Sequence, residues 1–115
     1  MATEVTIPVG WKTAVCAILR TWDQSLIPMT RTAQNDWAAT FPGNPWLGSL
    51  YDALIAYLSQ PDIKGRFAPN MIPPGEAYEF IFTFDGREVL GKINLTKEGK
   101  AHIVSAHIPR KGEKL

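Results

Sequence analysis

An Asp-Gly pair, Asp85-Gly86, limits what this 115-residue chain can fold into more than any other local feature. The pair stands between two runs of alternating apolar and polar residues, and a two-residue Asp-Gly loop in that setting predicts a tight β-hairpin. The loop also sets the strand register, because Phe84 then faces Arg87. Counted outward from there, the predicted cross-strand partners are Phe82 with Val89, Phe80 with Gly91, Tyr78 with Ile93, Thr83 with Glu88, Ile81 with Leu90 and Glu79 with Lys92.

Two of these cross-strand pairs have a direct physical explanation in this register. The Phe80 ring opposite Gly91 covers backbone that a strand glycine leaves bare. Glu79 opposite Lys92 is a cross-strand pair of opposite charge, which contributes about 0.2–1 kcal/mol. The register therefore accounts for both aromatic and charged positions of the hairpin.

The second turn, around Gly99, leaves the third strand in one of two registers. A three-residue loop at 97–99 puts His102 on the sheet face that carries Lys92. A two- or four-residue loop puts His107 on that face instead, because a shift of one residue moves every side chain to the other side. In the strand after the turn, apolar residues occur at both sets of alternating positions. The apolar pattern therefore does not distinguish between the two registers. In a regular strand, the two histidines lie on opposite faces.

Helical periodicity precedes the strands. Apolar residues recur at helical spacing over residues 11–22 and again over 47–58, where an Asn-Pro pair before the second stripe is a good helix start. Residues 30–40 predict a weaker helix within a segment that is otherwise loop. Residues 60–75 contain four prolines and two glycines, so we expect a long and mostly irregular connection there.

These elements predict an α+β fold built as a single domain over residues 1–115. We expect two or three N-terminal helices packed on one face of a C-terminal antiparallel meander of at least three strands. Residues 1–10 are expected to form an extended lead-in and residues 108–115 a basic tail. The helices should cover the aromatic face of the sheet, which leaves the charged and histidine-bearing face polar.

Composition narrows the partners that the chain can have. The formal net charge of +1 does not support attraction of the whole molecule to nucleic acid or membrane, so such a partner would meet a local patch. Cys16 is the single cysteine, which excludes an intrachain disulfide and a cysteine-based zinc cluster. The first residues lack the pattern of a signal peptide, and no apolar run reaches the about 18 residues of a membrane helix. We expect a cytoplasmic protein with no membrane partner.

The polar face of the predicted sheet holds the candidate chemistry. Phosphate-loop, zinc-protease and nucleophile-elbow motifs are missing, so neither a metal site nor a cofactor is predicted. Cleavage of RNA through its own 2′-hydroxyl requires neither a metal nor an enzyme nucleophile. It requires a base, an acid and cations beside the phosphate. The catalytic candidates are His107, His102, Lys92 and Arg110, and the candidate substrate contacts are Arg87, Lys111 and Trp37.

Each of these residues also has a simpler structural interpretation. Lys92 can be the ion-pair partner of Glu79 on a solvated face, and each histidine can be a surface or hydrogen-bonded residue. The basic tail can be a frayed terminus. Trp37 lies in a segment without a clear apolar stripe, so an exposed ring there would indicate a partner surface.

The order of helices and strands resembles the small bacterial ribonuclease toxins of the RelE/colicin superfamily. The G-K-I-N-L run at 91–95 and the I-V-S-A-H-I-P run at 103–109 are similar to their late strands, and the resemblance covers about residues 46–111. It implies an endoribonuclease that cuts messenger or transfer RNA and is held off by a cognate antitoxin or immunity protein. It also implies that Lys92 and Arg110 stabilise the phosphate while His102 or His107 acts as acid or base. Such toxins are usually strongly basic and have four strands, whereas this chain is near neutral and shows three clear ones.

Two other classes of function stay open on the sequence. One is a non-enzymatic protein-binding domain, such as an immunity or antitoxin-like partner or a phage accessory protein. It would use an exposed sheet edge, Trp37 or the proline-rich connection at 60–75. The other is binding of single-stranded nucleic acid without cleavage, through the sheet face and the tail. The partners to consider are therefore RNA, a cognate antitoxin or another protein.

Overall fold

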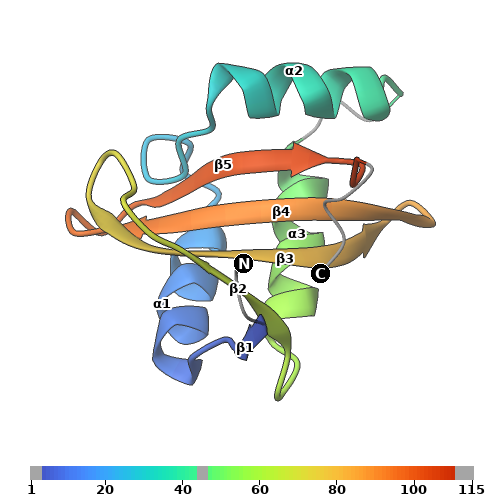
Figure 1. Cartoon of the computed structure of the whole chain (residues 1–115). Coiled ribbons are helices and arrows are strands. Elements are labelled where there is room, and N and C mark those ends of the chain that lie inside the picture. The colour runs from blue at the N-terminus through green and yellow to red at the C-terminus, as the bar shows by residue number, and fades with distance from the viewer. Residues whose placement is uncertain (1–3, 44–46, 111–115) are drawn as a thin grey trace.

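The computed structural model describes residues 4–43 and 47–110 and has an α+β fold (Figure 1). In chain order the elements are β1 (Glu4–Thr6), α1 (Val9–Leu19), α2 (Arg31–Thr40), α3 (Leu47–Leu58), β2 (Lys64–Ala68), β3 (Gly75–Phe84), β4 (Arg87–Thr96) and β5 (Ala101–His107). The strands form one antiparallel sheet in the order β1-β2-β3-β4-β5. The predicted fold class, with helices before a C-terminal antiparallel sheet, is confirmed. The Asn-Pro helix start, Lys111 and most of the basic tail lie outside the described residues.

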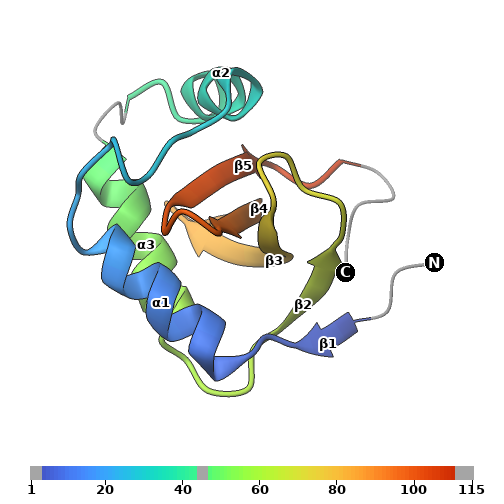
Figure 2. The ribbon, with the colours of Figure 1, turned by 90° about the vertical axis from the view of Figure 1, so that its left-hand side faces the viewer.

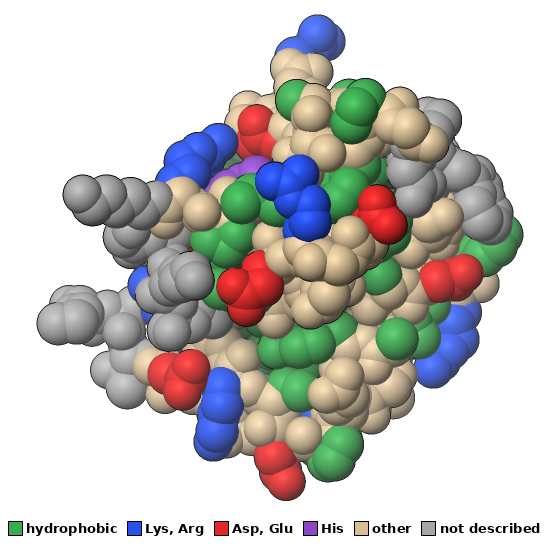
Figure 3. All heavy atoms as spheres, turned by 90° about the vertical axis from the view of Figure 1, so that its right-hand side faces the viewer, with side chains coloured by type: hydrophobic (Ala, Val, Ile, Leu, Met, Phe, Trp, Pro, Cys, Tyr) green, Lys and Arg blue, Asp and Glu red, His purple; other side chains and the backbone are tan. Residues whose placement is uncertain are grey.

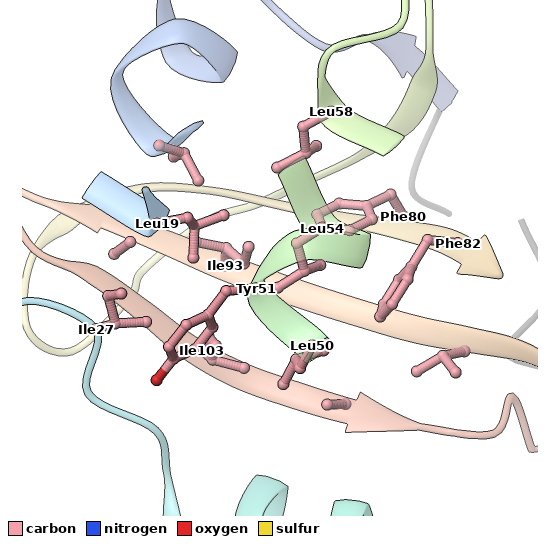
Figure 4. Close-up of a cluster of buried hydrophobic side chains, with 14 of the residues drawn as sticks. Leu19, Ile27, Leu50, Tyr51, Leu54, Leu58, Phe80, Phe82, Ile93 and Ile103 are labelled. Carbon is pink, nitrogen blue, oxygen red and sulfur yellow. The ribbon is translucent and has the colours of Figure 1, made fainter. Parts of the chain in front are cut away.

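Two of the helices cover one face of the sheet. Figure 2 shows α1 and α3 on the same side of β3, β4 and β5, while α2 lies along the β5 edge. Figure 4 shows the core between them, where Leu19 and Leu54 of the helices lie in one cluster with Phe80 and Ile93 of the sheet. The aromatic face is therefore the buried one, as predicted. None of the helices in the described part of the chain has the length and apolar character needed to cross a membrane.

The first hairpin has the register predicted from its turn. Phe84 faces Arg87 and the pairing continues without interruption to Gly75 and Thr96. Asp85 and Gly86 have φ angles of 50° and 76°, which a turn of this type requires at both central positions. A Cβ on Gly91 would lie 3.0 Å from the Phe80 ring, so the aromatic side chain does cover this glycine.

The connection predicted to be irregular contains a strand. Residues 64–68 form β2, which pairs with β1 on one side and β3 on the other. The lead-in likewise supplies β1, whose Val5 faces Gly65. Periodicity missed β2 because the strand is short, contains Gly65 and is followed directly by Pro69. The sheet therefore has four consecutive strands after α3.

The second hairpin has one of the predicted registers next to its turn and the other register further along the strands. Its loop is the three-residue one, because Thr96 N–H donates to the Lys100 carbonyl and Ile93 faces Ile103. The pairing then shifts, so that Lys92 faces Ser105 and β5 has one extra residue, Val104. This β-bulge reverses the phase of the strand beyond it.

The bulge brings both histidines to the same face of the sheet. His102 faces Asn94 before the shift, and His107 faces Leu90 after it. The prediction that they lie on opposite faces is wrong, because β5 is not a regular strand. The bulge is supported from outside the sheet, since the Thr30 hydroxyl donates to the Val104 carbonyl at 3.0 Å.

Candidate functional site

A row of charged side chains crosses the polar face of the sheet. Arg66 on β2, Glu79 on β3 and Lys92 on β4 are direct cross-strand neighbours. Glu79 lies between the two cations, with its oxygens 3.7 Å from Arg66 Nη2 and 3.6 Å from Lys92 Nζ. Ion pairs with this partial exposure contribute at most about 1 kcal/mol each. Lys92 therefore has the structural partner that the sequence suggested.

A second cluster lies where β5 ends and joins α2 to the sheet. Asp36, on α2, has its Oδ2 3.7 Å from His107 Nδ1 and 3.5 Å from Arg110 Nη2. Arg110 Nη1 lies 3.2 Å from His107 Nε2. The His107 side chain is 10% exposed and the Arg110 side chain 61% exposed, so a largely buried imidazole sits beneath a solvent-facing guanidinium. We call these three residues the His107 cluster.

The contacts of His107 indicate which ring nitrogen carries the proton. A guanidinium has only N–H donors, so the imidazole nitrogen that faces it must act as the acceptor. The Arg110 contact therefore fits the neutral tautomer that has its proton on Nδ1, the nitrogen that faces the Asp36 carboxylate. The Asp36 carboxylate beside Nδ1 favours this tautomer by its charge, at 3.7 Å, which is longer than a hydrogen bond. The cluster is therefore arranged as a base beside a cation.

Asp36 was not predicted from the sequence. It lies in the helix with the weakest apolar pattern, and nothing in its neighbours marks it as functional. The fold brings it to His107 because α2 packs along β5. The N-terminus of α2 is fixed there by Thr30, whose hydroxyl accepts from Ala33 N–H.

His102 lies apart from this cluster. It faces Asn94, four residues along β4 from Leu90, so about 13 Å of strand separates the two histidine positions. Its Nδ1 and the Asn94 Oδ1 are buried and have no hydrogen-bond partner among the residues that the structure describes, while Asn94 Nδ2 donates to the Pro73 carbonyl. His102 and His107 therefore do not share one reaction centre.

Burial lowers the pKa of His102 below its ordinary value of 6.5. The unfolded chain consequently binds more protons at this residue as the pH falls through 6.5, so acid favours unfolding. We expect the free energy of unfolding to fall between pH 7.5 and about pH 5. We expect this fall to be smaller in His102→Gln, measured by urea denaturation at both values. Equal pH dependence in the two proteins would contradict this assignment.

Arg87 lies in the wall of a cavity beside the residues that follow β5. Arg87 and Glu88 line a shallow cavity of about 270 Å³ with Ile108 and Pro109, next along the chain from His107. Figure 3 faces this end of the molecule and shows histidine surface beside basic and acidic side chains. Arg87 thus stays a candidate substrate contact.

The prediction of Trp37 as a substrate contact does not fit the structure. Trp37 is 3% exposed, and its ring centroid lies 4.5 Å from that of Phe41 and 4.7 Å from that of Phe84. A ring enclosed by two aromatic neighbours cannot offer a face to a nucleobase. Trp37 is a core residue that attaches α2 to the sheet.

Comparison of the chain with protein-family models, with curated proteins and with solved structures gives no significant match. Within residues 4–43 and 47–110, no group of three or more His, Cys, Asp or Glu side chains could hold a metal ion. The chemistry of this chain has therefore to be argued from its own geometry.

Proposed function

We propose that this protein is a metal-independent endoribonuclease of bacterial toxin type that acts in the cytoplasm through the His107 cluster. The observation that supports this most directly is the position of His107, between the Asp36 carboxylate and the Arg110 guanidinium. Cleavage of RNA by its own 2′-hydroxyl needs a base and a cation at the phosphate, and this cluster offers one of each.

In the proposed reaction, Arg110 moves from His107 to a phosphate oxygen of the bound RNA, which its exposure allows. His107 Nε2 then takes the proton of the 2′-hydroxyl, and that oxygen attacks the adjacent phosphorus. The bond from phosphorus to the 5′ oxygen breaks, and the leaving oxygen takes a proton from water. The products are a 2′,3′-cyclic phosphate and a 5′-hydroxyl. Asp36 stabilises the imidazolium that forms.

Further residues on the same face supply contacts to the substrate. Lys92 lies two residues along β4 from the partner of His107, about 7 Å away along the strand, and adds a second cation near the phosphate. Arg87 lies in the cavity beside Ile108 and Pro109, where a neighbouring nucleotide would bind.

The order of elements agrees with the resemblance to RelE/colicin-type toxins. The four strands β2 to β5 follow the helices as one meander, and β1 adds a fifth strand at the edge of the sheet. The same resemblance supplies the rest of the proposal, namely messenger or transfer RNA as the substrate and a cognate antitoxin or immunity protein as the partner.

A cleavage assay with matched substrates tests the proposal. We expect purified protein in excess EDTA to cut a single-stranded RNA and to leave 2′,3′-cyclic phosphate ends, detected by mass spectrometry. The same sequence with 2′-O-methyl groups should stay intact, because the attacking hydroxyl is blocked. Intact RNA in the first reaction, or cleavage of the methylated strand, would overturn the proposal.

One observation favours a protein-binding domain as the second candidate. Ile72 is 89% exposed in the connection between β2 and β3, and Phe67 on β2 is 47% exposed. Exposed large apolar side chains in neighbouring segments are typical of a partner surface. A domain of this kind should leave the growth of an expressing cell unimpaired, whereas a ribonuclease toxin should arrest growth in a way that His107→Gln relieves.

A further inference from the structure

A cavity of about 380 Å³ lies between α1 and the end of α3, on the helical side of the molecule. This volume falls in the range of sites for small molecules, about 300–1,000 Å³. The cavity is separate from the His107 cluster, which lies at the junction of α2 and β5. Its walls are formed by Val9, Lys12, Thr13, Cys16, Arg20, Leu58, Ser59, Gln60 and Pro61.

Lys12 is the unusual residue of this cavity because it is a buried cation, 7% exposed. Its Nζ donates to the Gln60 carbonyl at 2.8 Å, across the cavity wall from α1 to the end of α3. This is the one hydrogen bond that the Lys12 side chain makes to the described residues, and an ammonium group has three N–H donors. The contact with a carbonyl near the negative end of α3 helps a buried charge to be tolerated. It leaves two donors for a ligand.

The charged side chains in the cavity wall are all positive. Arg20, which follows the last residue of α1, is an exposed second cation in the wall. None of the nine wall residues is acidic, and among the described residues neither Lys12 nor Arg20 forms an ion pair with a carboxylate. A buried charge without a counter-ion is costly, so an anion bound here would stabilise the folded protein.

Apolar side chains form part of the remaining wall, beside Thr13, Ser59 and Gln60. Leu58 is 1% exposed and the Cys16 thiol side chain 4% exposed, while Val9 is 72% exposed. A ligand that placed a charged group on Lys12 and Arg20 would therefore lay its remaining atoms against hydrocarbon. Inorganic anions such as phosphate cannot use these apolar walls, whereas an acyl chain can.

We propose that this cavity binds a small organic carboxylate with a short apolar chain. The carboxylate accepts a hydrogen bond from Lys12 Nζ, Arg20 adds a second positive charge to the wall, and the chain packs against Cys16, Leu58 and Val9. The charge-assisted hydrogen bond from Lys12 gives orientation, and burial of the chain gives most of the remaining affinity. The site is independent of the proposed ribonuclease activity.

An NMR titration with hexanoate tests this proposal on the intact chain. We expect the backbone amides of Thr13, Cys16, Ser59 and Gln60 to shift and to saturate, with a dissociation constant in the range of about 1–10 mM. Hexanamide has the same chain without the charge and should bind at least about tenfold more weakly. Shifts that do not saturate, that map to other residues, or that are equal for the two compounds would overturn the proposal.

Two variants and a control assign the cations. Lys12→Met keeps the length of the side chain and should weaken hexanoate binding by about tenfold. Arg20→Gln, at an exposed position, should weaken it by about threefold without affecting folding. Arg31→Gln removes an exposed cation of α2 outside the cavity and should leave binding unchanged. If Lys12→Met does not fold, the affinity of Arg20→Gln and the comparison with hexanamide still test the proposal. An unchanged hexanoate affinity in Arg20→Gln would contradict the assignment of Arg20 to the site.

Discussion

Replacing His107 with glutamine is expected to lower the rate of RNA cleavage by about 10²–10⁴-fold, the usual contribution of a general base. The glutamine side chain is similar in size and can hydrogen bond to both Asp36 and Arg110, but it cannot take a proton from the 2′-hydroxyl. The loss should therefore be in kcat, with KM little changed. Single-turnover cleavage of a labelled RNA measures it, and an unchanged denaturation midpoint confirms that the variant is folded.

The neighbours of His107 make this prediction specific. Asp36→Asn removes the charge behind Nδ1 and should lower kcat by at least about tenfold. Arg110→Gln removes the cation at the phosphate and should reduce both binding and rate. His102→Gln is the matched control, because His102 lies about 13 Å away along the sheet and should not affect cleavage. Full activity in His107→Gln, or a comparable loss in His102→Gln, would show that the cluster is not the catalytic site.

The sequence was sufficient for the first hairpin because a single dipeptide determines its geometry. Asp85-Gly86 supports one turn type, and the register of every residue from Gly75 to Thr96 follows from it. The second hairpin lacked such a determinant. The three-residue loop is one of the predicted alternatives, but the bulge at Val104 receives a hydrogen bond from Thr30, which is 74 residues away in sequence. No local pattern contains that information.

The same limit explains what was missed at both sites. Asp36 reaches His107 through the packing of α2 on β5, and a lone aspartate in a weak helix gives no signal of that contact. Lys12 belongs to the helical pattern of α1 only as a polar position, yet the end of α3 buries it. Trp37 is a candidate substrate contact on the sequence because its helix has a thin apolar stripe, but Phe41 and Phe84 enclose it. Residue types indicated the chemistry, and long-range packing decided which residues meet.

Gly65→Ala is expected to lower the free energy of unfolding by about 2–4 kcal/mol, at the upper end of what overpacking usually costs. A Cβ at this position would lie 2.3 Å from the Glu79 carbonyl oxygen and 2.9 Å from Ile7 Cδ1. The oxygen belongs to the backbone of β3 and cannot rotate away, and Ile7 is fully buried. The added methyl group can therefore be accommodated only if β2 moves away from β3.

Gly10→Ala is the matched control for this substitution. A Cβ on Gly10 meets no atom within 4 Å, and the residue lies in the first turn of α1. Because alanine favours the helix over glycine, this variant should be as stable as the original protein or more stable by up to about 1 kcal/mol. Urea denaturation of the three proteins measures the difference. Equal stability of the two variants would mean that β2 does not lie against β3 as described, and the ion pair between Arg66 and Glu79 would then lose its structural basis.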